Sequence, residues 1–105
     1  MAWIYLLLAG CFEMGWPVGL KLAQGPGQKL LGLSVALLCL AFSGLLLWLA
    51  QKEIAMGTAY AVWTGIGAAG TFLIGVWCFG DPASLARYGG VSLIVAGVVV
   101  LKVAH

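Results

Sequence analysis

Four long apolar runs, nearly free of charged side chains, restrict what this chain can fold into. They cover about residues 3–22, 30–50, 57–79 and 85–102. Each run is close to the roughly 20 apolar residues that a membrane-spanning helix needs. The chain is also 64% hydrophobic and only 8% charged, which lies outside the composition of soluble domains. We therefore expect an all-α integral membrane protein, in which residues 1–105 form one domain of four transmembrane helices.

Short turn segments separate these runs. Residues 25–27 read Gly-Pro-Gly, which breaks a helix, and residues 51–53 are polar. Pro82 disfavours helix at Asp81 and so ends the third run. The first run is longer than the apolar core of a signal peptide, so we expect it to stay in the protein as a helix.

The cysteine, histidine and basic residues argue against several classes of function. Cys11, Cys39 and Cys78 lie in separate runs without a CxxC spacing, and His105 is the only histidine. The five basic residues are scattered, so we expect no nucleic-acid partner. No nucleophile with an adjacent base is visible in the sequence. We therefore expect no metal site, no cofactor and no enzymatic activity.

The basic residues are almost evenly divided between the two sides of the membrane. If the four helices alternate in direction, Lys21, Lys29 and Arg87 lie on one side and Lys52 and Lys102 on the other. Cytoplasmic loops normally carry an excess of Lys and Arg, and this excess sets the orientation. A difference of three against two is hardly a bias. We expect the chain to insert both ways round, and two opposed copies to form an antiparallel homodimer.

Glycines mark places where helices can approach closely. Gly90 and Gly97, seven residues apart on one face of the last run, predict the dimer seam, because membrane interfaces are enriched in small residues. Glycines in the third run favour either a bendable helix beside a moving site or close packing alone. The third run contains Gly65, Gly67, Gly70 and Gly75.

Glu13 is the only charged side chain between Ala2 and Leu20 and lies near the middle of the first run. A charged side chain at the bilayer centre costs about 2.5–3.5 kcal/mol on insertion scales, so an acid there is a candidate functional site. The alternative is a structural role, in which Glu13 forms hydrogen bonds between helices. We interpret Glu13 as the centre of a functional site.

Two neighbours of Glu13 share its helix face. Residues three and four apart lie on one side of a helix, which places Gly10 and Trp16 beside the acid. We expect Gly10 to leave open space there. The indole N–H of Trp16 can donate to Glu13, because tryptophan is only a donor and usually needs a partner when buried.

Hydroxyl and aromatic groups in the second and third runs can complete this site. Ser43 is central in the second run, and Tyr60, Trp63 and Gly67 share a face of the third. The aromatic residues have an alternative role as belts at the membrane surface. An acidic pocket lined by rings and hydroxyls suits an organic cation, which carboxylates pair with and ring faces attract.

The full chain resembles the small multidrug resistance (SMR) family. The shared features are four short helices, Glu13 at the centre of the first, Lys21 eight residues later, the segment GTAYAVWTGIG at residues 57–67, and paired glycines in the fourth helix. Gly10 before the acid and Trp16 after it are similar to the guanidinium-exporter (Gdx) subtype. The resemblance implies a dual-topology homodimer of the bacterial inner membrane that exports guanidinium-type cations in exchange for protons.

The same resemblance implies a role for each site residue. Glu13 of both subunits binds substrate or proton, and Trp16 and Ser43 bond to Glu13 and orient it. Trp63 lines the site. Tyr60 couples occupancy of the site to the opening of one side.

The chain departs from this subtype at Pro17, where the pattern has a small residue other than proline, and at the less bulky pair Met14-Gly15. A substrate range that extends to biguanides or guanylurea is consistent with this departure. Two alternatives stay open. One is a promiscuous exporter of quaternary ammonium compounds, against which Trp16 argues, and the other is a non-transporting subunit of a hetero-pair.

Overall fold

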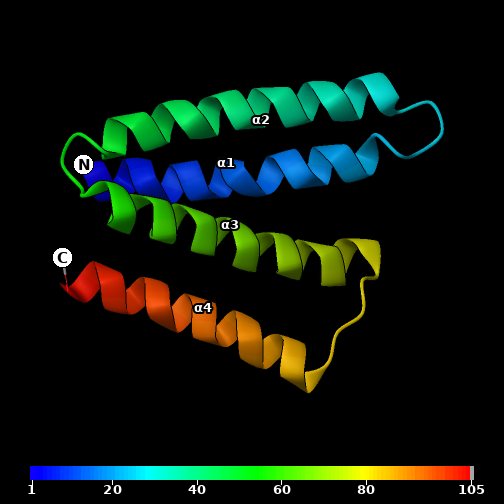
Figure 1. Cartoon of the computed structure of the whole chain (residues 1–105). Coiled ribbons are helices and arrows are strands. Elements are labelled where there is room, and N and C mark those ends of the chain that lie inside the picture. The colour runs from blue at the N-terminus through cyan, green and yellow to red at the C-terminus, as the bar shows by residue number, and fades with distance from the viewer. Residues whose placement is uncertain (105) are drawn as a thin grey trace.

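The computed structural model describes residues 1–104, which form four α-helices joined by short loops (Figure 1). The helices are α1 (Ala2–Leu22), α2 (Lys29–Ala50), α3 (Met56–Phe79) and α4 (Leu85–Ala104). All four are long and apolar enough to cross a membrane. The expectation of an all-α membrane protein with four transmembrane helices is therefore confirmed.

The four helices lie side by side in a flat array rather than around a central core. Their order across the array is α2, α1, α3, α4, and consecutive helices along the chain run in opposite directions (Figure 1). The molecule measures 45 × 34 × 16 Å. Since one α-helix with side chains is about 10–12 Å across, the thinnest dimension leaves both broad faces of the array uncovered.

Close packing between α1 and α2 depends on two glycines that face each other. A Cβ added at Gly19 would lie 2.6 Å from the backbone nitrogen of Ala36, and one added at Gly32 would run into the backbone at Ala23. Any larger side chain would force the backbones apart, as expected where small residues allow membrane helices to approach. This contact fixes α1 against α2 near the first loop.

Two turns require glycine because their backbone is left-handed. Gly27 in the first loop has φ +72°, and Gly80 after α3 has φ +70°, a region in which side chains other than glycine are strained. The N–H groups of Gly80 and Asp81 both donate to the carbonyl oxygen of Gly75, which closes the last turn of α3. The turn predicted at Asp81-Pro82 therefore begins with a glycine cap.

The helix α4 packs only against α3 and has no fully buried residue. A Cβ added at Gly65 of α3 would lie 2.6 Å from Cγ2 of Val98, so this glycine brings the two helices together. At the end of the array where both chain termini lie (Figure 1), the ammonium of Lys102 lies 5.1 Å from the ring centre of Trp3 on α1. The outer surface of α4 is therefore open to lipid or to another protein.

Candidate functional site

Glu13 lies at the middle of α1 and points toward α3. A Cβ added at Gly67 of α3 would lie 3.1 Å from Cβ of Glu13 and closer still to its Cγ. The absence of a side chain at Gly67 therefore makes room for the acid. The structure thus brings Gly67 of α3 and Glu13 of α1 together.

An open pocket of about 310 Å³ lies beside the acid, between α1 and α3. Glu13 and Pro17 of α1 form one side of it. The other side is a face of α3, formed by Thr64, Gly67, Ala68, Thr71 and Phe72. The threonine hydroxyls and the carboxylate give this mainly apolar pocket its polar groups.

Two buried polar atoms near the pocket have no hydrogen-bond partner among the residues that the structure describes. They are Oε1 of Glu13 and Nε1 of Trp16. An unsatisfied buried group costs about 1–3 kcal/mol, and here an acceptor and a donor are unsatisfied one helical turn apart. The expected hydrogen bond from Trp16 to Glu13 is absent from this structure. Each atom is left available to another partner.

Ser43 bonds to the backbone of α1 and not to the carboxylate of Glu13. Its hydroxyl is fully buried, donates to the carbonyl oxygen of Ala9 at 2.8 Å, and accepts a hydrogen bond from Nε1 of Trp63 at 2.7 Å. In an α-helix the carbonyl of Ala9 also accepts the N–H of Glu13. The implied bond from Ser43 to Glu13 is therefore replaced by a chain from α3 through α2 to the turn of α1 that carries the acid.

Tyr60 continues this group toward the surface. Its ring packs against that of Trp63, with centres 5.4 Å apart and planes inclined at 52°. Tyr60 is 56% exposed on the face of the array. The structure thus joins Ser43, Trp63 and Tyr60 in one cluster, while Trp63 and Tyr60 do not line the pocket itself.

The interpretation of Gly10 as open space is wrong. Gly10 is buried, and a Cβ added there would lie 2.6 Å from Cγ2 of Ile66 on α3. The side chain of Ile66 fills the space that the sequence suggested was empty. Gly10 therefore allows α1 and α3 to pack closely one turn before Glu13.

The glycines of α3 and α4 differ in their surroundings. Gly67 accommodates Glu13, and a Cβ at Gly70 would run into the thioether of Met14, so these positions match the close-packing alternative. Gly90 and Gly97 of α4 are exposed and have no atom within 4 Å of an added Cβ. Their assignment to a dimer seam stays a prediction, which their open surroundings fit.

The sequence analysis missed Thr64, Thr71 and Phe72 on the wall of the pocket. Thr64 and Thr71 stand three and four residues from Gly67, so helical spacing alone places all three on one face. That spacing was the available signal once Gly67 had been placed opposite Glu13. Phe72 carries no such signal, because it is five residues from Gly67 and nothing in the sequence distinguishes it from the other apolar residues of α3.

Metal-binding groups do not gather in the part of the chain that the structure describes. Within residues 1–104 no group of three or more His, Cys, Asp or Glu side chains could hold a metal ion. Cys11, Cys39 and Cys78 are free.

Comparison with known proteins identifies the family of this chain. Residues 1–94 match the family described as Small Multidrug Resistance protein. The chain is 47% identical over 104 residues to the guanidinium exporter of Yersinia pseudotuberculosis serotype I (strain IP32953), with 99% of each chain covered. It is 44% identical over 102 residues to the guanidinium exporter of Salmonella typhimurium (strain LT2), covering 97% of this chain and 96% of the relative. The guanidinium exporter of Citrobacter freundii is 41% identical over the same shares. The chain therefore belongs to the small multidrug resistance family, whose members are multi-pass proteins of the bacterial inner membrane.

Proposed function

We propose that this chain is a transporter that exports guanidinium and related small guanidinyl cations in exchange for protons. The observation that carries the proposal is the carboxylate of Glu13, which lies in a pocket beside the middle of α1 with one oxygen buried and unpartnered. The relatives named guanidinium exporters cover nearly the whole chain and support the choice of substrate.

The chemistry of the pocket favours a guanidinium ion over a larger cation. Guanidinium presents planar forks of N–H donors that match the two oxygens of a carboxylate, and the hydroxyls of Thr64 and Thr71 can accept further N–H groups. A volume of about 310 Å³ lies at the lower end of the roughly 300–1,000 Å³ of small-molecule sites. A quaternary ammonium ion has no N–H to offer these acceptors.

Exchange follows if each Glu13 carries either a proton or a share of the cation. An empty, charged carboxylate inside the membrane is costly, so release of one ligand is favoured only when the other takes its place. The proton and the cation are then carried across the membrane in opposite directions. Proton and cation flux are coupled through a single side chain.

We propose that two copies of the chain form the transporter as an antiparallel homodimer. The flat array leaves the pocket beside Glu13 open and α4 without a buried residue, so one protomer lacks the walls that would close this pocket off from lipid. A second, opposed copy would supply those walls, with Gly90 and Gly97 allowing the two α4 helices to approach. The nearly balanced charges of the loops support both orientations in one membrane.

Flux measurements on the purified chain in proteoliposomes test this function. With an acidic lumen, labelled guanidinium should accumulate inside as protons leave, and tetraethylammonium should not. Equal transport of tetraethylammonium would favour the promiscuous multidrug exporter. No flux from this chain alone, with flux restored by a paralogous chain, would favour the hetero-pair.

A further inference from the structure

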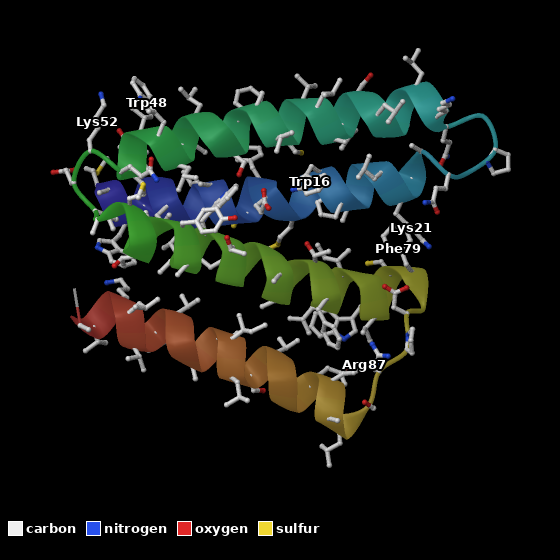
Figure 2. All side chains as sticks on the ribbon, viewed as in Figure 1. Trp16, Lys21, Trp48, Lys52, Phe79 and Arg87 are labelled. Carbon is white, nitrogen blue, oxygen red and sulfur yellow. The ribbon has the colours of Figure 1, made fainter. Side chains whose placement is uncertain are left out.

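A second pocket lies between the ends of α1 and α3, where the two helices reach the membrane surface. It has a volume of about 150 Å³, and its walls include Lys21 of α1, Phe79 of α3 and Asp81 of the loop that follows. Figure 2 shows Lys21 and Phe79 close together at this end, opposite the end that carries Trp48 and Lys52. The proposed transport cycle assigns no role to these residues.

The outer pocket is adjacent to the pocket of Glu13. Pro17 and Thr71 line both of them. Along α1 the pocket residues Glu13, Pro17 and Lys21 follow one another at intervals of four, which keeps them on one face. Eight residues of helix correspond to about 12 Å, so the outer pocket extends from Pro17 to Lys21, about 12 Å along α1 from Glu13.

The loop holds the carboxylate of Asp81 against the end of α3. The N–H of Asp81 donates to the carbonyl oxygen of Gly75 at 3.0 Å, and a Cβ added at Gly75 would run into the carboxylate oxygen Oδ2. Gly75 therefore leaves the space that the carboxylate occupies. The left-handed Gly80 provides the turn that brings Asp81 back over the helix.

This position is electrostatically unfavourable for an acid that has no cation in direct contact with it. The C-terminal end of a helix carries a partial negative charge, and a second negative group beside it is destabilising. Among the residues that the structure describes, Asp81 forms no ion pair, although Lys21 lies across the same pocket. The carboxylate and the helix end together attract a cation from solution.

We infer that the pocket between Lys21 and Asp81 is an outer binding site for the transported guanidinium-type cation, which it occupies on its way between Glu13 and the membrane surface. The inference rests on the proposed function. The carboxylate of Asp81 accepts N–H groups of the cation, the hydroxyl of Thr71 accepts one as the cation moves inward, and the ring of Phe79 attracts it from the apolar side. Lys21 repels the cation and so keeps this outer site weak.

Removing the charge of Asp81 and that of Lys21 tests the inference, because the two changes should shift the KM for guanidinium in opposite directions. At low ionic strength Asp81→Asn should raise the KM for guanidinium about threefold to fivefold, the scale of one exposed charge interaction, with little change in the maximal rate. Lys21→Gln should lower the KM. Both effects should shrink in high salt, which screens exposed charges.

Glu53→Gln is the matched control, because Glu53 is an exposed acid in the loop at the other end of the array. It should leave the KM unchanged. If Asp81→Asn and Lys21→Gln shift the KM in the same direction, the two residues act only on each other and the inference is overturned. An equal effect of Glu53→Gln would mean that general surface charge is responsible, which also overturns it.

A binding measurement separates this inference from the proposed function. In Glu13→Gln the inner site is disabled, so guanidinium chloride should still shift the amide resonance of Gly80 saturably, relative to sodium chloride at equal ionic strength. Glu13→Gln with Asp81→Asn should lose that shift. Absence of the shift in Glu13→Gln would contradict the outer site even in a protein whose wild type transports. Absence of wild-type transport would contradict the proposed function and leave the shift of Gly80 intact.

Discussion

The side chain of Glu13 has its present position only because residue 67 has no Cβ. In Gly67→Ala the added methyl group would lie 3.1 Å from Cβ of Glu13 and nearer to its Cγ, whereas carbon atoms in ordinary contact are about 3.5–4.0 Å apart. Glu13 would have to adopt another rotamer or α3 would have to move. We expect the substitution to impair cation binding while the helices remain assembled.

The size of the effect follows from the cost of overpacking, which is about 1–3 kcal/mol. With about 1.4 kcal/mol for each factor of ten, guanidinium affinity should fall by about fivefold to 150-fold if the loaded state bears the whole cost. The assay is uptake of labelled guanidinium into proteoliposomes as a function of its concentration. Size-exclusion elution in detergent checks that the variant remains folded.

Gly70→Ala is the matched control, one turn further along the same helix. Its added methyl group would meet the thioether of Met14, which is flexible and adapts to small changes in volume. Affinity in Gly70→Ala should stay within about twofold of the wild type, because the thioether end of Met14 can move aside and Met14 does not line the pocket of Glu13. Wild-type affinity in Gly67→Ala together with a loss in Gly70→Ala would refute the placement of Glu13 against Gly67.

Three further substitutions test other parts of the account. Ser43→Ala should lower the free energy of unfolding by about 1–3 kcal/mol, because it leaves Nε1 of Trp63 unpaired. The double variant Ser43→Ala with Trp63→Phe should lose less stability than the sum of the two single variants. Additive losses would contradict the chain of hydrogen bonds. Pro17→Ala should weaken transport of biguanides or guanylurea more than that of guanidinium, because proline frees the carbonyl of Glu13 as an additional acceptor; equal effects on all substrates would remove Pro17 from the site. Replacing Gln24 and Gln28 with lysine should confine C-terminal tags to one side of the membrane and reduce guanidinium flux, because opposed copies would be lacking. Tags confined to one side in the wild type would reject dual topology.

The four helices were predictable because the signal for a membrane span is length without charge, and neither depends on tertiary contacts. The two turns with glycine at positive φ were predictable from local sequence too, since residues 25–27 and the segment after Phe79 contain the Gly and Pro residues that end a helix. The position of Glu13 in the middle of a membrane helix was predictable as well, because an acid in an apolar run is visible without knowledge of its neighbours.

What faces Glu13 could not be read from the sequence in the same way. The helices are apolar on every side, so hydrophobic periodicity does not fix how each one is rotated about its axis. For this reason the sequence suggests open space at Gly10, although the side chain of Ile66 fills it. The bond from Ser43 to the backbone of Ala9 also depends on the rotation and spacing of α1 and α2, and no pattern in the sequence encodes it.

The central claim is that one carboxylate, that of Glu13, holds either a proton or the cation. The most direct test is proton release when guanidinium is added to the detergent-solubilised protein in weakly buffered solution, followed across a series of pH values. We predict saturable release from the wild type and none from Glu13→Gln eluting at the same size. Guanidinium binding to the wild type without proton release, or unchanged release from Glu13→Gln, would contradict the account.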